Sequence, residues 1–151
     1  MTDGVSSRRS KPLLTCVIAP VSGEDDAEAT AAALEPYVEI GDVDRLVVTH
    51  VIEKGGGSLD SVPVSTQQEI AADAFTAVEE RLTEYPVDIG TRTEYHTDIV
   101  DGILAAVTEE DATAIAFVPR GGSRLVDLLT GDIRTRLVHE CDRPVIALPG
   151  K

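Results

Sequence analysis

Residues 114–133 read AIAFVPRGGSRLVDLLTGDI, and this stretch indicates both the fold and a candidate binding site. The apolar run from Ala114 to Val118 predicts a strand, the glycines after it predict a loop, and Asp132 can cap a helix that follows. Glycine lacks a Cβ, so such a loop can bring backbone N–H groups close to an anion, as can the first turn of a helix. The stretch therefore predicts a phosphate site, and its candidate residues are Arg120, Gly121, Gly122, Ser123 and Arg124.

The same alternation of strand and helix runs through the whole chain. The apolar and alternating patterns predict strands at 13–19, 46–52, 87–95 (an edge strand), 114–118 and 145–148. Helical spacing of apolar residues predicts helices at 24–38, 65–82 and 98–111 and from 132 onward. This order predicts a Rossmann-like α/β fold, a three-layer α/β/α sandwich with a five-stranded parallel, doubly wound sheet in strand order 3-2-1-4-5. The loops at 20–23 and 118–132 are then expected to meet at the carboxyl ends of strands one and four.

Local signals predict where the helices begin and end. Ser65 stands three residues before Gln68, a spacing typical of a capping box at the start of the second helix. Thr97 or Asp98 can cap the third helix. Pro36 is expected to bend or interrupt the first helix near its end, because proline lacks the N–H group that a helix requires.

Length and charge limit the class of protein. The 151 residues suit one domain at 13–151, preceded by a flexible arm at 1–12, and no run approaches the about 20 apolar residues of a membrane span. The net charge of −14 argues against nucleic acid and anionic membranes as partners. Only three of the 13 basic residues are Lys, and the acids are spread along the chain, which predicts a salt-tolerant surface and a halophilic, cytoplasmic origin. The alternative explanation of the acidic composition is that it only keeps the protein soluble, with no adaptation to salt.

The cysteines and histidines predict neither a disulfide nor a metal site. Cys16 and Cys141 both adjoin apolar runs, so we expect buried, reduced thiols. His50, His96 and His139 stand in different segments without the spacing of metal ligands.

From about residue 13 to residue 149, the chain resembles the universal stress protein family. The resemblance rests on the element order, the loop spacing and the ending Asp142-Arg143-Pro144-Val145-Ile146. It implies the fold type of the adenine nucleotide alpha hydrolases. It also implies a homodimer in which the last strands, here Val145 to Leu148, pair across a two-fold axis.

The first loop resembles that of nucleotide-binding members only in part. Pro20 and Val21 match the family pattern, but Ser22 stands where the family has an aspartate that holds the ribose hydroxyls. By the same resemblance, a backbone group near Val51 at the end of the second strand would recognise adenine.

The signature after the fourth strand also departs from the family pattern. Nucleotide-binding members have Gly-x-x-Gly, nine residues, then Gly and Ser or Thr. Gly121 and Gly131 match with nine residues between them, but Val118 replaces the first glycine and Asp132 the hydroxyl residue. Ile133 follows and completes the candidate site. A bulky side chain and an added negative charge predict weak or lost binding of ATP or AMP, or else an Asp132 carboxylate that substitutes for the anion.

The sequence and the resemblance are compatible with several functions. We expect a non-catalytic stress-response or regulatory homodimer with at most residual binding of an adenine nucleotide or small anion. The first alternative is an ATP-binding, nucleotide-dependent switch. The second is a PP-loop type ATP-using enzyme, suggested by Ser22, Gly23 and Asp26, although Glu24 and Ala27 depart from that loop. A third is a binding module that contacts a partner through the loop at 55–63.

Overall fold

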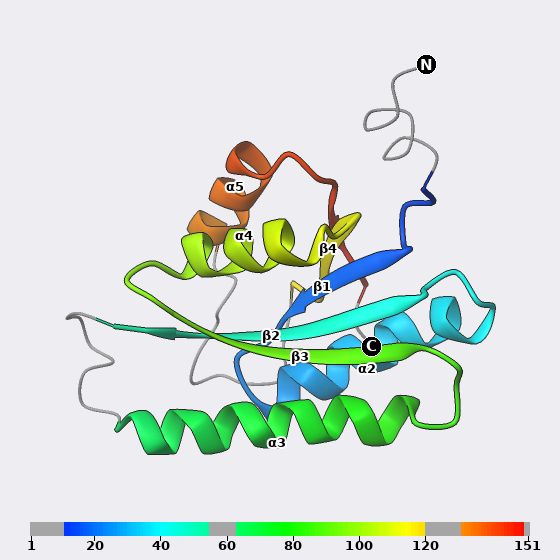
Figure 1. Cartoon of the computed structure of the whole chain (residues 1–151), viewed down its shortest axis with the longest axis horizontal. Coiled ribbons are helices and arrows are strands. Elements are labelled where there is room, and N and C mark those ends of the chain that lie inside the picture. Colours follow the sequence, from blue (N-terminus) through cyan, green and yellow to red (C-terminus); the bar gives the residue numbers. More distant parts are fainter. Residues whose placement is uncertain (1–10, 55–62, 120–130, 150–151) are drawn as a thin grey trace.

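The computed structural model describes residues 11–54, 63–119 and 131–149, which form one layered α/β unit (Figure 1). Strands and helices alternate along the chain. In order, they are β1 (Cys16–Pro20), α2 (Glu24–Glu39), β2 (Arg45–Glu53), α3 (Val64–Leu82), β3 (Asp88–His96), α4 (Ile99–Glu110), β4 (Ala114–Phe117), α5 (Gly131–Glu140) and β5 (Val145–Ala147). The predicted arm up to residue 10, most of the loop at 55–63 and the glycine loop at 120–130 lie outside the described residues.

The five strands form one parallel sheet in the order β3-β2-β1-β4-β5, which confirms the predicted topology. Strand β1 is central and pairs with β2 along its whole length and with β4 at Val17 and Ile18. Strand β3 lies at an edge, as its alternating pattern predicts, because it pairs with β2 alone within the described sheet. Strand β5 forms the opposite edge.

The helices cover the sheet on both faces, which confirms the three-layer sandwich (Figure 1). Helices α2 and α3 pack on one face, where Val17 and Ala19 of β1 are buried. Helices α4 and α5 pack on the other, where Ile18 is buried. Successive side chains of a strand point to opposite faces, so a strand covered on both sides must be apolar throughout. Within the described ranges, no helix has the length and apolar character needed to cross a membrane.

Strand β1 begins later than the predicted start at Leu13. The Thr15 N–H group and hydroxyl both donate to the carbonyl oxygen of Pro12, at 3.2 and 2.9 Å. This turn leaves Leu13 half-exposed. The apolar character of the segment therefore predicts the strand correctly but not its first residue, because the turn uses hydrogen bonds that the strand would need.

Helix α2 continues through Pro36 to Glu39, so the predicted interruption is wrong. Proline removes one hydrogen bond, but the helix goes on for only three residues beyond it. The Ile40 N–H group donates to the Pro36 carbonyl oxygen at 3.2 Å, and Gly41 with φ +88° then turns the chain away. At the last turn of a helix, proline costs little of the hydrogen-bond ladder.

Helix α3 begins at Val64 with Pro63 as its N-cap, so the capping box predicted at Ser65 and Gln68 is wrong. No side chain caps this end of the helix. The Gln68 amide nitrogen instead donates to the Tyr95 hydroxyl at 2.7 Å, which links α3 to the edge strand β3. The Gln68 side chain, which the local sequence assigns to the cap, thus forms a tertiary contact instead.

The cap predicted at Asp98 is confirmed, because its Oδ2 accepts from the Asp101 N–H group at 3.0 Å. Arg136 of α5 also donates to the two Asp98 oxygens, at 2.8 and 3.1 Å, and so joins α5 to the start of α4. The cap predicted at Asp132 is wrong, since Asp132 is the second residue of α5 and lies within its first turn. Its negative charge still suits the positive end of the helix dipole.

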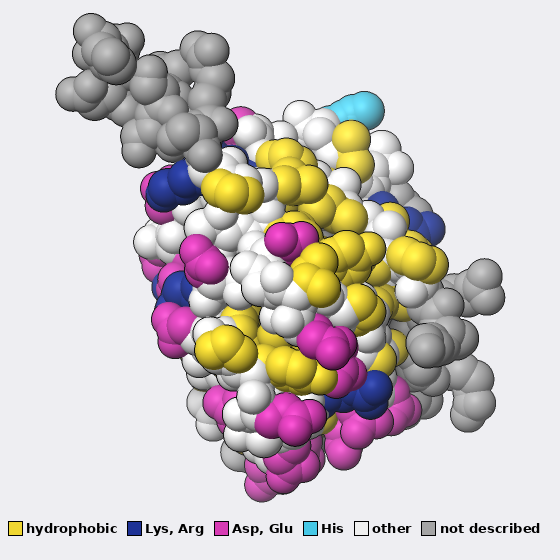
Figure 2. Space-filling model, turned by 90° about the vertical axis from the view of Figure 1, so that its right-hand side faces the viewer, with side chains coloured by type: hydrophobic (Ala, Val, Ile, Leu, Met, Phe, Trp, Pro, Cys, Tyr) yellow, Lys and Arg dark blue, Asp and Glu magenta, His cyan; other side chains and the backbone are white. Residues whose placement is uncertain are grey.

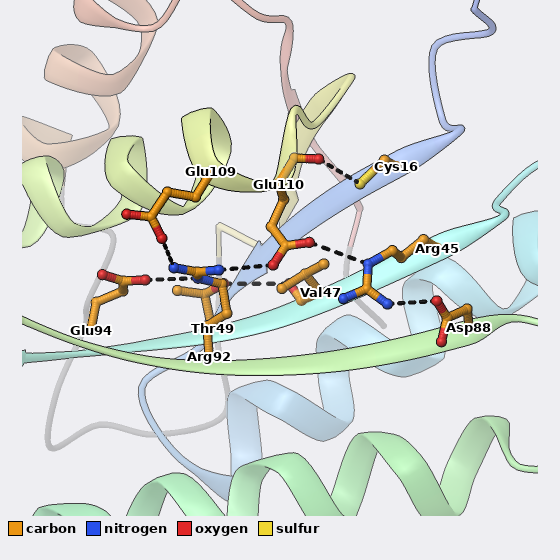
Figure 3. Close-up of polar contacts among 9 residues, drawn as sticks. All are labelled: Cys16, Arg45, Val47, Thr49, Asp88, Arg92, Glu94, Glu109 and Glu110. Carbon is orange, nitrogen blue, oxygen red and sulfur yellow. Dashed lines mark hydrogen bonds and ion pairs between the residues drawn. The ribbon is translucent and has the colours of Figure 1, made fainter.

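Arg92 on β3 joins the edge strand to the last turn of α4 (Figure 3). Its guanidinium donates to Glu94 at 2.7 Å and to Glu110 at 2.8 Å, and it also bonds Glu109. The Arg92 and Glu94 side chains are 23% and 11% exposed, so these pairs are shielded from solvent more than ordinary surface pairs.

Arg45 on β2 extends the same network (Figure 3). It donates to the other carboxylate oxygen of Glu110 at 3.3 Å and to Asp88 at 2.5 Å. Its guanidinium lies across Gly90, where an added Cβ would come within 2.5 Å of a guanidinium nitrogen. A side chain at position 90 would therefore displace the Arg45 guanidinium, which is the far end of a flexible side chain, from its present position.

Replacing Arg92 tests the contribution of the network. We expect Arg92→Met to lower the free energy of unfolding by about 2 kcal/mol, because it leaves the shielded Glu94 carboxylate without its cation and leaves Glu110 with Arg45 alone. Arg81→Met is the matched control, since Arg81 pairs with Glu35 but is 45% exposed. Urea unfolding of the three proteins measures both effects. Equal losses in the two variants would contradict the assigned role of Arg92.

Candidate functional site

The candidate site begins where β1 ends at Pro20, and the turn of residues 21–23 leads into α2. The Val21 N–H group donates to the Thr49 carbonyl oxygen of β2 at 2.9 Å, so the turn stays attached to the neighbouring strand. Val21 itself is fully buried. The turn thus lies at the carboxyl end of the sheet, where ligands of doubly wound folds bind.

Asp26 in the first turn of α2 binds the backbone of this turn. Its Oδ1 accepts from the N–H groups of Ser22 and Gly23 at 3.1 and 2.8 Å. Its Oδ2 accepts from the Ser22 N–H group at 2.8 Å and from the Ser22 hydroxyl at 3.0 Å. Both carboxylate oxygens are therefore engaged with Ser22, which stands where the resemblance leads us to expect a ribose-binding aspartate.

Burial and hydrogen bonding act on Asp26 in opposite directions. Burial disfavours the charged form and raises the pKa of its carboxyl group, while the bonds from Ser22 and Gly23 lower it, and the net shift is upward. His50 on β2 is a titratable group that faces Asp26 from the sheet. Asp26 is thus a desolvated carboxylate held by the backbone of its own turn.

His50 holds the same turn from the side of the sheet. Its Nδ1 lies 3.1 Å from the Val21 carbonyl oxygen, which can only accept, so Nδ1 carries the hydrogen. The residue is buried, and burial lowers the pKa of the imidazole below its ordinary 6.5. The ring is therefore neutral at pH 7 and acts as a structural donor.

Val51 places its side chain in the core rather than toward a ligand. It is 5% exposed and belongs to the cluster beneath α4. A Cβ added to Gly102 of α4 would lie 2.7 and 2.9 Å from the two Val51 methyl groups, so the helix approaches β2 as closely as glycine allows. Its side chain is therefore used for packing, and the backbone recognition of adenine that the resemblance implies for Val51 stays a prediction.

Val118 is also a core residue. It follows β4 directly, is 6% exposed, and shares a buried cluster with Val21 and Leu148. The Leu148 N–H group donates to the Phe117 carbonyl oxygen at 2.7 Å, which closes the end of β5 over the same region. Val21 and Val118, which flank the two loops of the candidate site, are thus brought together by packing.

The second half of the site is described only at its end. Gly131 begins α5, Asp132 is exposed in its first turn, and Ile133 packs against the core cluster beneath α4 and α5. The remaining candidates lie outside the described residues, and they are Arg120, Gly121, Gly122, Ser123 and Arg124.

Neither cysteine is paired, and both are half-buried rather than fully buried as predicted. Burial is the main cause that raises the pKa of each thiol, so neither is an activated nucleophile. No group of three metal-binding side chains comes together in the part of the chain that is described.

The roles of Asp26 and His50 are not among the predictions from the sequence. Asp26 is expected there only as an acid at the positive end of the first helix or as part of a PP-loop, although an acid at the third position of a helix is a recognised signal for a cap that reaches back to the preceding backbone. His50 lies within an apolar strand, and nothing local shows that its ring reaches across to the turn after β1. That contact depends on the register between β1 and β2, which cannot be predicted from either segment alone.

This arrangement defines the class of protein as a Rossmann-like α/β protein with its candidate site at the switch point of the sheet. The sequence model of the universal stress protein family matches residues 17–149, so the chain belongs to that family. No curated protein matches the sequence.

Solved structures share this fold. A universal stress protein family member from Burkholderia pseudomallei is similar with a TM-score of 0.67 and 21% identity, over 91% of this chain and 98% of that one. The universal stress protein of Archaeoglobus fulgidus, solved with dAMP, is similar with a TM-score of 0.62 and 18% identity, over 89% and 97%. An Arabidopsis thaliana family member with AMP bound is similar with a TM-score of 0.62 and 15% identity, over 91% and 92%. At these identities, the likeness establishes the fold.

The neutral state of His50 predicts a pH dependence of stability. Its pKa is lowered in the folded protein, so below pH 6.5 the unfolded chain takes up the proton first and stability falls. We expect His50→Asn, which keeps a donor near the Nδ1 position but does not titrate, to reduce this fall by up to about 1 kcal/mol between pH 7.5 and 5.5. Urea unfolding across this range provides the measurement. Parallel pH profiles for the two proteins would show that His50 is not the titrating group.

Proposed function

We propose that this protein is a non-catalytic stress-response or regulatory member of its family, with residues 13–151 as its single domain. It acts as a homodimer in the cytoplasm, and its binding of ATP is weak or lost. Its acidic surface with Arg-based ion pairs suits a salt-rich cell interior. The observation that carries the nucleotide part is the engagement of Ser22, whose N–H group and hydroxyl both donate to Asp26.

The departures from the family signature support weak binding. Val118 fills part of the core at the end of β4 and cannot give a ligand the close backbone approach that glycine permits. Asp132 adds a negative charge to the first turn of α5, which repels a phosphate bound at that end of the helix. Arg120 and Arg124 act in the opposite direction if they face the phosphate rather than the surface acids.

A nucleotide-dependent switch is the second candidate function. The relatives from Archaeoglobus fulgidus and Arabidopsis thaliana were solved with dAMP and AMP, which favours an adenine nucleotide as the ligand of this site as well. The PP-loop type enzyme has no comparable support, because the Asp26 carboxylate on which it depends is directed onto its own backbone.

The edge strand β5 supports the dimer. It pairs with β4 on one side, and the other side has no partner among the described residues. Val145 and Ile146 are half-buried and Ala147 is exposed, so an apolar edge is available for a second copy. Apart from β5, Figure 2 shows hydrophobic side chains between acidic ones on the side of the molecule that lies at the right of Figure 1.

Calorimetric titration with ATP tests the nucleotide part of the proposal. We expect no micromolar binding by the wild type and a clear gain in the variant that combines Val118→Gly with Asp132→Ser, because it removes the bulk and the charge together. Asp132→Ser alone serves as a variant that leaves the core intact. Micromolar affinity in the wild type would refute weak binding and favour the nucleotide switch.

Light scattering at low and high salt tests the dimer. We expect the mass of two chains for the wild type and of one chain for Ala147→Glu, because a two-fold axis would bring the added charges together at the β5 edge. Thr91→Glu is the matched control, since Thr91 is exposed on the opposite edge strand β3. A monomeric wild type, or two variants that behave alike, would contradict pairing through β5.

A further inference from the structure

The turn of residues 21–23 has its polar backbone groups occupied by the protein itself. The Val21 N–H group donates to Thr49, and the Val21 carbonyl oxygen accepts from His50. The N–H groups of Ser22 and Gly23 both donate to Asp26. These contacts fasten the turn from two directions, through β2 on one side and through α2 on the other.

Two of these contacts come from side chains, those of His50 and Asp26, and it is Asp26 that engages the N–H groups of Ser22 and Gly23. The bonds to β2 belong to the sheet and to a buried ring, whereas Asp26 reaches the turn through a single carboxylate from the first turn of its helix. Its two oxygens receive bonds from the Ser22 N–H group, the Ser22 hydroxyl and the Gly23 N–H group. These are also the donors that an oxygen-bearing ligand would meet at the carboxyl end of β1.

We propose that Asp26 is an internal latch that occupies the donors of Ser22 and Gly23 and must let go before the oxygens of a nucleotide can bind there. The inference rests on the proposed function, since it treats this turn as part of the nucleotide site. It adds an autoinhibitory contact within α2 to the obstacles at Val118 and Asp132. The ligand oxygens belong either to the sugar hydroxyls or to the phosphate of the nucleotide.

The surroundings of Asp26 make the latch sensitive to acid. A protonated carboxyl group carries a hydrogen on one oxygen, so it can no longer accept bonds from all three donors. Burial favours that protonation, because it raises the pKa of the carboxyl group. His50 faces it from β2, and Glu24 and Asp25 lie beside it in the same turn of α2. Lower pH therefore loosens the contact on Ser22 and Gly23.

Affinity measurements on Asp26→Ala test the latch directly. We expect the variant to bind AMP about tenfold more tightly than the wild type, because three donors become available to the ligand. Asp25→Ala is the matched control, since Asp25 carries the same charge in the same turn of α2 but is exposed and, among the described residues, forms no hydrogen bond with residues 21–23. We expect it to change AMP affinity less than twofold. Titrations with adenosine and with inorganic phosphate show whether the sugar or the phosphate uses the donors.

A second readout needs no ligand. Protection of the Ser22 and Gly23 amides, measured as their hydrogen-exchange rates relative to the intrinsic rates at the same pH, should fall in Asp26→Ala, and in the wild type as the pH is lowered, but not in Asp25→Ala. If Asp26→Ala proves too unstable for titration, adenosine affinity of the wild type at pH 7 and pH 5 provides the comparison, because adenosine lacks the phosphate that titrates near pH 6. Unchanged exchange would show that no latch exists.

The outcomes separate the latch from the proposed function. Faster exchange with unchanged AMP affinity would overturn the latch as a barrier to ligand while leaving weak ATP binding intact. Micromolar ATP binding by the wild type would refute the proposed function itself. The latch would also be overturned if the Val118→Gly, Asp132→Ser variant gained binding while neither Asp26→Ala nor the wild type at low pH did.

Discussion

Burial of β1 on both faces is the constraint on which the rest of the structure depends. Val17 and Ala19 enter one core cluster and Ile18 enters the other, so two pairs of helices must cover the sheet. Parallel strands joined by crossover helices satisfy that requirement, because each crossover places a helix on a face of the sheet. The same arrangement brings the ends of β1, β2 and β4 together, which places the candidate site at one end of the sheet.

The position of the candidate site thus follows from the packing of the core. The groups that it can offer a ligand are those that the core does not bury. Val51 and Val118 face inward, so they offer a ligand only backbone and the space around it. The polar groups that remain at the end of β1 are satisfied by Asp26 and His50. The N–H groups at the end of β1 are in this way used for hydrogen bonds within the protein, while the site keeps its position in the fold.

The sequence predicts the fold well because each strand and helix depends on a pattern that extends over many residues. The order of the strands and the edge position of β3 follow from that pattern. Single-residue features are predicted less well, because other contacts compete for the same groups: Gln68 bonds Tyr95 instead of capping α3, and Thr15 bonds Pro12 instead of extending β1. The link between His50 and Val21 depends on two strands at once, so no local pattern could reveal it.

The close approach of Gly102 to Val51 gives the molecule a mechanical property. With no free space between α4 and the end of β2, a displacement of that strand end has to tilt the helix. Arg136 of α5 donates to both carboxylate oxygens of Asp98, the N-cap of α4, so the two helices are linked at that end. The end of β2 and the start of α5 are therefore connected through α4 as well as through the sheet.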